Sequence, residues 1–415
     1  MKAKILVVGG GAMGTCIALH AATRCDPLKE PVILIEKDRL GAGSSGRSNA
    51  IIHQGYGDRQ LAGMARDALK VYAGLEQNTG RSVGYRRTGV LLFAGPNDTA
   101  ARAELEANIE MQSSIGIDVR RVEAEEIRGI VPGIEVEDGT LGAFEPDGGF
   151  VDSARTIQAF ATLARDRGAA TRIGVKNPTI LVENGRAIGV ETSAGTFYAP
   201  MIVLATGPWT PFILRDFNID LPLRVVRTQQ HFIRMPIPSR DDEDEATFDS
   251  SDSSEFETRF VPDPLDRMPV AHPVLYDLQK GLSIRCEPSE ARTRITRLGF
   301  KQLPDVSDPE QLDREVDPEF IRWARQSASS RLPVYETMPD VGSQAAWITL
   351  TPDERPIVGP VKEMPGLYVA TGFSGNDFQL APSIGEGMAQ MLMDEPVSAF
   401  DPEFFSLERF QQART

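Results

Sequence analysis

The chain has 415 residues, which predicts two or three domains rather than one small domain. Hydrophobic residues make up 41% and charged residues 25%, a composition that excludes a disordered, collagen-like or coiled-coil chain. A formal charge of −15 argues against nucleic acid as a partner, because an acidic chain repels phosphate groups. No apolar run reaches the length of a membrane span, so none is expected.

Cysteine and histidine usage argues against disulfides and metals. Cys16, Cys25 and Cys286 form neither a CxxC pair nor a disulfide framework, which predicts a reducing compartment and a cytoplasmic protein. Four histidines are scattered without metal-ligand spacing, so no metal site is expected. They are His20, His53, His231 and His272.

The first elements predict a dinucleotide site. Residues 4–8 read as a buried parallel strand, and a helix is expected over about 12–23. Between them Gly9, Gly11 and Gly14 satisfy GxGxxG, which permits a tight turn, close approach of backbone to a pyrophosphate, and close helix packing. The N-terminus of that helix would face the phosphates.

An acidic residue supports this interpretation. The apolar run 32–35 predicts a second strand and ends in Glu36, 22 residues after Gly14. That spacing suits the carboxylate that hydrogen-bonds a ribose 2′-hydroxyl, and it disfavours NADP, whose 2′-phosphate would be repelled. The alternative is a glycine-rich turn of another α/β unit, in which Glu36 only ends a strand.

The middle of the chain alternates helices and strands. The loop 41–50 is rich in glycine and serine, suits close contact with a cofactor, and has residues able to cap a helix. Hydrophobic spacing predicts helices over 58–78, 97–114, 124–130 and 153–167 and a strand over 88–94. Residues 174–204 read as strands with a turn at 183–185, ending in a buried strand over 201–204 before Ala205-Thr206-Gly207.

An antiparallel sheet is expected from about residue 221 to 300, where strand-like alternation recurs. Within it, the segment 240–257 holds nine acidic residues and one base, so it is predicted to be a mobile loop. The alternative is a docking surface for a basic partner. Further on, strand 367–370 leads into the glycine-rich turn 371–382 and a helix over 383–392.

Both NAD and FAD fit the first glycine turn. FAD is favoured, because glycine-rich turns after strands recur near residues 9, 205 and 372 instead of within one continuous NAD domain. In chain order the motifs VVGGGAMG, LIEKD, GSSGRSNAIIHQGY, EPDGGFVD, VLATGPWT, TPDERPIVGP and LYVATGFSGNDFQLAP resemble the D-amino-acid oxidase superfamily. Within it they resemble the glycine oxidase, sarcosine oxidase and dimethylglycine dehydrogenase branch, including the sarcosine oxidase β subunit.

The resemblance implies an α/β FAD-binding domain of Rossmann (glutathione-reductase-like) type, interleaved with an α+β substrate domain on an antiparallel sheet. The expected FAD domain comprises 1–85, 145–220 and 335–415, and the substrate domain 86–144 and 221–334. The helix expected at 383–392 would point its N-terminus at the flavin. The residues that the resemblance places around FAD are Gly9, Gly11, Ala12, Met13, Gly14, Glu36, Lys37, Ser44, Ser45, Arg47, Ser48, Asn49, Ala50, Val175, Ala205, Thr206, Gly207, Trp209, Gly372, Phe373, Ser374, Gly375, Asn376, Asp377, Phe378 and Gln379.

Several family positions differ here. Relatives that bind flavin covalently use a cysteine or histidine where this chain has Ala346 or Arg47, so FAD is predicted to be non-covalent. The basic residues that hold the substrate carboxylate in sarcosine oxidases are replaced by His53 and Gln379. Arg285 is the best substitute cation, unless it is only a surface residue.

The resemblance implies oxidation of the C–N bond of a secondary or N-methyl amino acid, or a related amine, by hydride transfer to flavin N5. His53, Tyr56, Arg285 and Gln379 are the candidate catalytic-pocket residues. Partners are a small amine or amino acid and oxygen or another electron acceptor, with a homo-oligomer or hetero-subunit assembly left open. The alternatives are a 2-hydroxy-acid or polyol dehydrogenase, in which His53 takes the alcohol proton, and the flavoprotein subunit of a multi-subunit amine oxidase or dehydrogenase.

Overall fold

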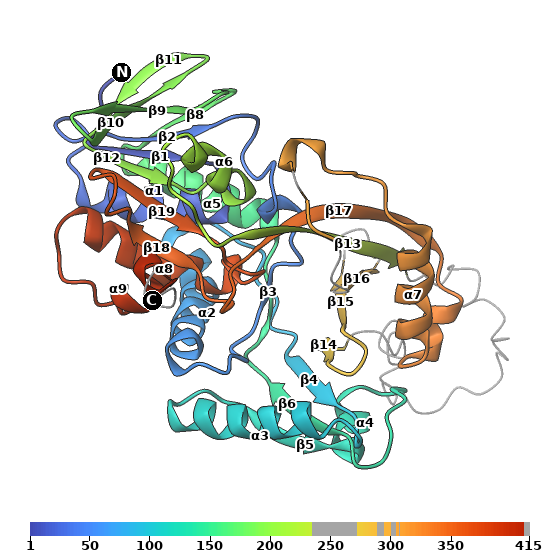
Figure 1. Ribbon diagram of the computed structural model, residues 1–415. Helices are drawn as coiled ribbons and strands as arrows, with labels where there is room; N and C mark the ends of the chain where they lie inside the picture. The colour runs from blue at the N-terminus through green and yellow to red at the C-terminus, as the bar shows by residue number, and fades with distance from the viewer. Residues whose placement is uncertain (235–271, 289–293, 300–303, 307, 411–415) are drawn as a thin grey trace, which may run out of the picture.

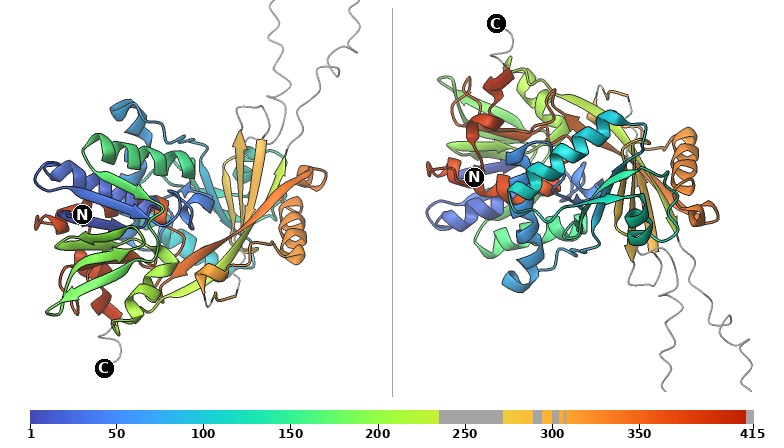
Figure 2. Two further views of the ribbon diagram at one scale, coloured as in Figure 1. Left: turned by 90° about the horizontal axis from the view of Figure 1, so that it is seen from above. Right: turned by 90° about the horizontal axis from the view of Figure 1, so that it is seen from below.

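Two sheets organise the molecule. The computed structural model describes residues 1–234, 272–288, 294–299, 304–306 and 308–410, and Figure 1 shows it from the side. A six-stranded sheet with its helices forms one lobe, and an eight-stranded sheet forms the other (Figure 2). The acidic segment 240–257 lies outside the described residues.

Each of the glycine-rich turns follows a strand of the six-stranded sheet. Its order is β18-β19-β12-β1-β2-β8, with all neighbours parallel except β18 and β19. The half-exposed edge strand β8 was not predicted, because its residues ATRI show no apolar alternation. The strands are β1 (Ile5–Val8), β2 (Val32–Glu36), β8 (Ala170–Ile173), β12 (Met201–Leu204), β18 (Ile357–Pro360) and β19 (Leu367–Thr371).

Alternate residues of this sheet face two different layers. Ile5 and Val7 pack against helices, whereas Leu6 and Val8 pack against a small three-stranded sheet. The helices are α1 (Ala12–Arg24), α2 (Arg59–Thr79), α5 (Ser153–Asp166) and α8 (Asp377–Leu392). The small sheet holds β9 (Thr179–Glu183), β10 (Arg186–Thr192) and β11 (Gly195–Tyr198), and α6 (Thr210–Arg215) lies on the same side.

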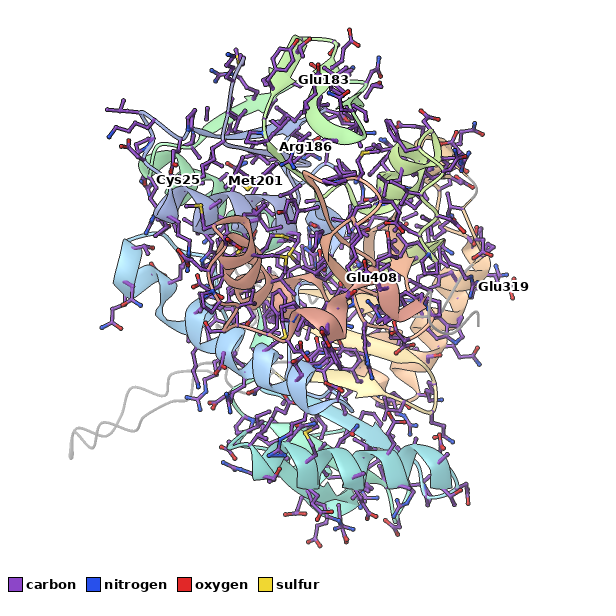
Figure 3. The ribbon with its side chains drawn as sticks, turned by 60° about the vertical axis from the view of Figure 1, so that its left-hand side comes forward. Cys25, Glu183, Arg186, Met201, Glu319 and Glu408 are labelled. Atoms are coloured by element: carbon purple, nitrogen blue, oxygen red, sulfur yellow. The ribbon has the colours of Figure 1, made fainter. Side chains whose placement is uncertain are left out.

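The turn between β9 and β10 was predicted correctly. Glu183 pairs with Arg186 across a two-residue turn, and both side chains lie on the small three-stranded sheet (Figure 3). The turn residues Asn184 and Gly185 have φ of 50° and 76°, the left-handed region that such hairpins require.

The eight-stranded sheet has the order β17-β13-β16-β15-β14-β4-β6-β5. It is antiparallel as expected, except for the parallel pair β4 and β14, which come from distant parts of the chain. Its strands are β4 (Val90–Ala94), β5 (Arg120–Glu123), β6 (Leu141–Glu145), β13 (Arg224–Arg234), β14 (Val274–Asp277), β15 (Leu282–Pro288), β16 (Arg294–Gly299) and β17 (Asp340–Leu350). Helices α3 (Thr99–Ser114), α4 (Ala124–Ile130) and α7 (Pro318–Ser329) accompany it, and α4 and α7 share its outer core.

Three predicted helix starts are confirmed by their caps. Asp58, Asp98 and Asp152 precede α2, α3 and α5, and each carboxylate accepts a hydrogen bond from a backbone N–H of the first turn. The serine-rich loop gives only a three-residue helical turn, Ser45–Arg47, whose preceding residue makes no side-chain cap. Two short strands, β3 (Ile51–Ile52) and β7 (Gly149–Phe150), pair between the two large sheets.

The predicted start of the last long helix was wrong. Helix α8 begins at Asp377, not near Ser383, and contains Pro382. Proline has no N–H to donate to the carbonyl four residues earlier, that of Phe378. The hydroxyl of Tyr72 on α2 donates to that carbonyl instead, at 2.7 Å. A partner from another helix thus makes the internal proline tolerable, and no local sequence signal reveals it.

We expect Tyr72→Phe to destabilise the protein by about 1–3 kcal/mol, because it leaves the buried Phe378 carbonyl without its donor. Urea unfolding of the holoprotein measures the loss. Tyr198→Phe is the matched control, since Tyr198 is 46% exposed at the end of β11. Equal unfolding midpoints for the two variants would contradict a role for this hydrogen bond.

Candidate active site

The first glycine turn is built by close backbone contacts. Gly9 has φ of 111°, and a Cβ there would lie 2.4 Å from the carbonyl oxygen of Ala205. A Cβ on Gly14 would lie 1.9 Å from the carbonyl oxygen of Gly9. These spacings leave no room for side chains, so strand β1, helix α1 and the turn after β12 meet backbone to backbone, as the motif predicts.

Glu36 closes this turn from the neighbouring strand. Its carboxylate accepts hydrogen bonds from the backbone N–H groups of Gly10 at 2.7 Å and Asp38 at 2.9 Å. Both oxygens are therefore oriented at the end of β2, beside the glycines. The backbone N–H of Val175 donates to the carbonyl of Glu36 at 2.9 Å, which fixes Val175 next to it.

The serine-rich loop joins two helix N-termini. The hydroxyl of Ser45 accepts from the backbone N–H of Ala12 on α1 at 3.2 Å and donates to the carboxylate of Asp377 on α8 at 2.9 Å. Burial raises the pKa of Asp377 to about 6, although the Ser45 hydrogen bond acts in the opposite direction. Three predicted motifs, distant in the chain, therefore meet at one hydroxyl.

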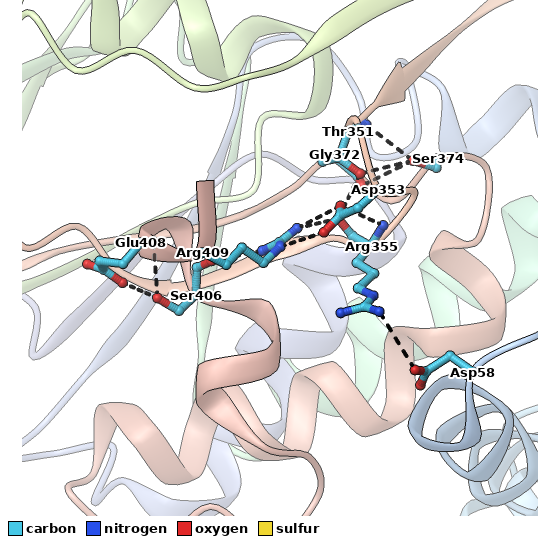
Figure 4. A network of polar contacts seen from close by, with 9 residues as sticks. All are labelled: Asp58, Thr351, Asp353, Arg355, Gly372, Ser374, Ser406, Glu408 and Arg409. Atoms are coloured by element: carbon cyan, nitrogen blue, oxygen red, sulfur yellow. Dashed lines mark hydrogen bonds and ion pairs between the residues drawn. The ribbon is translucent and has the colours of Figure 1, made fainter. Parts of the chain in front are cut away.

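A salt-bridged network supports the last glycine-rich loop (Figure 4). The backbone N–H of Thr351 donates to the hydroxyl of Ser374 at 3.3 Å, next to Gly372. Asp353, two residues after Thr351, accepts from Arg409 at 2.8 Å and 3.2 Å. The TPDERP motif and the C-terminal segment thus hold the turn in which Ser374 adopts a φ of 52°.

A cavity of about 570 Å³ lies over these motifs, within the range of cofactor sites. The hydroxyl oxygen of Ser44 and the indole nitrogen of Trp347, both on its wall, are buried without a hydrogen-bond partner among the described residues. Side-chain-free glycines and orphaned polar atoms fit a large polar ligand such as FAD. The predicted residues on its wall are Gly9, Gly11, Glu36, Lys37, Ser44, Ser45, Val175, Ala205, Thr206, Gly207 and Trp209.

Other predicted cofactor residues do not line this cavity. Ala12, Met13 and Gly14 are buried in α1, and Ser48, Asn49 and Ala50 lead away towards β3. Arg47 donates to the carbonyls of Ala42 and Gly43, and its guanidinium lies 5.3 Å from the Trp347 ring. Another group of predicted residues lies outside the cavity wall, in the turn before α8 and in its first turn. The turn holds Gly372, Phe373, Ser374, Gly375 and Asn376, and the helix begins with Asp377, Phe378 and Gln379.

The second sheet presents a polar face towards the first. Ile284 and Cys286 of β15 pack in the core with α7, so Arg285 points to the opposite face. Arg285 is 2% exposed, and its guanidinium lies 4.0 Å over the ring of Phe150. Tyr276 of β14 packs in the same cluster as Phe150. Arg285 is therefore a buried cation, which corrects the alternative of a surface residue.

His53 and Tyr56 lie beside this face. The His53 ring stacks on Tyr56 at 5.4 Å and meets Tyr276 edge-on at 5.5 Å. Burial lowers the pKa of His53 to about 4, so the imidazole is neutral near pH 7. The backbone N–H of Gly55 donates to Nδ1 at 3.2 Å, which places the proton on Nε2. Gln379 is buried at the start of α8, and within the described residues it makes no hydrogen bond to this cluster.

Glu145, a fully buried carboxyl group next to this cluster, was not among the predicted residues. One oxygen accepts from the backbone N–H of Gln54 at 2.7 Å, and the other has no partner among the described residues. Burial raises its pKa to about 7. Burial raises the pKa of Tyr56 and Tyr276, and the charge of the Glu145 carboxylate raises both further. The sequence did contain a signal for Glu145, because this acid ends an apolar strand as Glu36 does.

We expect Glu145→Gln to change how stability depends on pH. A carboxyl group with a raised pKa holds a proton in the folded state that the unfolded chain has lost. The free energy of unfolding therefore falls as pH rises from about 4.5 to about 7. The variant has no carboxyl group at this position and lacks this loss. The free energy of unfolding of the variant minus that of wild type should therefore be on the order of 2 kcal/mol more favourable at pH 8 than at pH 5.

Urea unfolding at pH 5 and pH 8 checks this expectation. Glu319→Gln is the control, because Glu319 lies exposed on α7 (Figure 3). If wild type and Glu145→Gln follow parallel pH profiles, the buried carboxyl group does not titrate as described.

The fold and these motifs define a dinucleotide-dependent oxidoreductase, and comparison with known proteins gives the family. The model of the DAO family, described as FAD dependent oxidoreductase, matches residues 4–391. The chain therefore belongs to this family, is an FAD-dependent oxidoreductase, and has the family's flavoprotein fold. The predicted family and cofactor are confirmed, whereas non-covalent attachment stays a prediction.

Relatives and solved structures agree with this assignment. Human peroxisomal sarcosine oxidase is 24% identical over 98% of this chain and 95% of its own length. Monomeric sarcosine oxidase of Bacillus sp. strain B-0618 is 25% identical over the same shares. L-Proline dehydrogenase from P. horikoshii superposes with a TM-score of 0.83 at 23% identity, covering 99% of this chain and 98% of that one. Glycine oxidase from Geobacillus kaustophilus gives 0.79 at 21%, covering 98% and 99%.

The described residues hold neither a candidate membrane span nor a candidate metal site. No described helix combines the length and apolar character needed to cross a membrane. In the same part of the chain, no three histidine, cysteine, aspartate or glutamate side chains lie close enough together to bind a metal ion. The cytoplasmic location remains a prediction.

Proposed function

We propose that this flavoprotein oxidises the C–N bond of a secondary or N-methyl amino acid, or a related amine. The single observation that carries the proposal is Arg285, a buried cation on the second sheet that lies over the ring of Phe150. A guanidinium in such a place suits a carboxylate, which it can bind through two parallel hydrogen bonds. The sarcosine oxidases among the relatives act on a substrate of this class, as their names state.

Each side chain around Arg285 has a separate role in this proposal. Arg285 orients the carboxylate, while the rings of Tyr276 and Tyr56 form walls that exclude water from the reacting carbon. Neutral His53 donates a hydrogen bond from Nε2 without adding charge. Bound FAD would supply the hydride acceptor, and these residues would position the substrate for hydride transfer.

The protonation of His53 also separates the amine proposal from its closest competitor. Oxidation of a 2-hydroxy acid needs a base for the alcohol proton. The Nδ1 lone pair of His53 already accepts from Gly55, and Nε2 carries the proton, so His53 has no free lone pair for that task. An amine is oxidised in its neutral form and does not require this base.

An anaerobic screen tests the proposal. Oxidised holoprotein is mixed with sarcosine, proline or 2-hydroxyglutarate, and bleaching of the flavin absorbance is followed. We expect reduction by one or both amino acids and none by the hydroxy acid. Reduction by 2-hydroxyglutarate alone would replace the amine proposal with its competitor. Reduction only after partner chains are added would favour the subunit of a larger amine oxidase.

A further inference from the structure

A segment of the second lobe reaches the cofactor cavity. Residues 308–315, here called the strap, lie between β16 and α7. Four of them line the cavity together with the first glycine turn: Pro309, Glu310, Leu312 and Arg314. The strap lies far from the glycine motifs in sequence, and neither the resemblance nor the family description assigns it a role.

The base of the strap is anchored to β13. The guanidinium of Arg227, 7% exposed, donates to the carbonyls of Asp313 and Glu315 and to the carboxylate of Asp317. Gln229, fully buried, donates to the same carboxylate at 2.7 Å and accepts from the backbone N–H of Asp317 at 2.6 Å. Two buried side chains of β13 thus hold the base by several hydrogen bonds, so we expect any opening motion at the tip.

The tip of the strap contacts two residues at the mouth of the cavity, and these two residues also contact each other. The carboxylate of Glu310 accepts a hydrogen bond from the indole N–H of Trp209 at 2.6 Å and forms an ion pair with Lys37. The Lys37 ammonium lies 3.8 Å from the centroid of the Trp209 ring. Lys37 follows β2 and Trp209 follows β12, so Glu310 ties together two strand ends of the first sheet.

These contacts are exposed and therefore easy to open. The side chain of Glu310 is 63% exposed and that of Lys37 is 29% exposed. Ion pairs in water contribute little, and salt screens them. The side chain of Asp308 accepts from the backbone N–H of Glu310 at 2.9 Å, which holds the tip in shape when it moves.

The strap also adds positive charge beside the cavity. The pKa of Arg47 is lowered, first by burial and then by the charges of Arg314 and Arg39. Arg314 and Arg39 therefore each lie close enough to Arg47 to repel it. Of the three, Arg314 lines the cavity, where its charge would attract an anionic ligand.

We propose that the strap is a latch on the FAD site, which Glu310 closes by holding Lys37 and Trp209, and which must open before FAD leaves. The glycine motifs form the floor of the site, and the latch sets how long FAD stays. FAD dependence is a property of the family, so this proposal does not depend on the identity of the amine.

The rate of FAD release tests the latch without any substrate. Holoprotein is diluted into an excess of a flavin-binding apoprotein as trap, and the rate of FAD transfer is followed by fluorescence. We expect Glu310→Ala to release FAD about five- to tenfold faster than wild type, because both the ion pair and the indole hydrogen bond are lost. Glu310→Gln keeps an acceptor for Trp209 and should give a smaller increase.

Ionic strength provides a second readout that needs no disruptive variant. Raising the salt concentration should speed FAD release from wild type more than from Glu310→Gln, because only wild type has the Lys37 ion pair. Glu315→Gln is the matched control, since Glu315 lies in the same strap and forms no ion pair in the described part of the chain.

The latch is refuted if both Glu310 variants release FAD within twofold of the wild-type rate. It is equally refuted if Glu315→Gln accelerates release as much as Glu310→Ala, or if salt acts equally on wild type and Glu310→Gln. None of these outcomes bears on the amine screen, which reports flavin reduction and not flavin release.

Discussion

Arg285→Ala should raise KM for an anionic amino acid substrate roughly a hundredfold, about 3 kcal/mol in transition-state binding. Arg285 is 2% exposed, so the carboxylate that we expect it to bind would lose a desolvated, charge-assisted partner and find no water in its place. A neutral amine of similar size lacks that carboxylate and should lose much less. The ratio of kcat/KM for the two substrates, compared between wild type and variant, measures the effect.

Arg285→Lys is the sharper companion variant. Lysine keeps the charge but lacks the planar fork that binds both carboxylate oxygens and stacks on Phe150, so an intermediate KM is expected. Arg128→Ala serves as the control, because Arg128 is exposed on α4, which packs on the opposite face of the same sheet, and it pairs with Asp138. An unchanged KM in Arg285→Ala would remove Arg285 from substrate binding and with it the main support for an acidic substrate.

Gly14→Ala should abolish FAD binding and strongly reduce the yield of folded protein. The added Cβ would lie 1.9 Å from the carbonyl oxygen of Gly9, and backbone atoms cannot move away as the end of a flexible side chain can. Helix α1 would have to shift from β1, which misplaces the N–H groups that the dinucleotide needs. The flavin-to-protein absorbance ratio of the purified variant measures the loss.

Gly63→Ala is the matched control for this substitution. Gly63 lies in α2, and a Cβ there meets nothing within 4 Å. That variant should bind FAD like wild type and gain slight stability, because alanine favours a helix more than glycine does. If Gly14→Ala retains a full complement of FAD, the close packing of α1 on the glycine turn is not required for cofactor binding.

The parts of the site that follow from local rules were predictable. The glycine spacing, the strand ends and the acid at Glu36 lie within 38 residues, and each has a steric or electrostatic cause that is visible in sequence. The aspartate caps before α2, α3 and α5 belong to the same kind of signal. These features are set by neighbouring residues and depend little on the rest of the fold.

Features that depend on distant partners were not predictable. The helix start predicted near 383 was wrong, because Tyr72, 306 residues before Phe378, supplies a donor that lets α8 contain Pro382. The burial of Glu145 depends on how the two sheets meet, and the parallel pairing of β4 with β14 joins segments that share no local pattern. The predicted division into discontinuous domains stays a prediction, as do the individual roles of the site residues.

The position of β19 has a consequence for synthesis of the protein. In the six-stranded sheet β19 lies between β12 and β18, and α8, which follows it, packs on α1 and α2. Proteins emerge from the ribosome N-terminus first. A nascent chain that holds β1, β2 and β12 but has not reached residue 371 exposes an unpaired edge of β12 and a bare helix face. The glycine turn is synthesised first, but β19 and α8 are synthesised last. The complete flavin site therefore forms only when synthesis is almost finished.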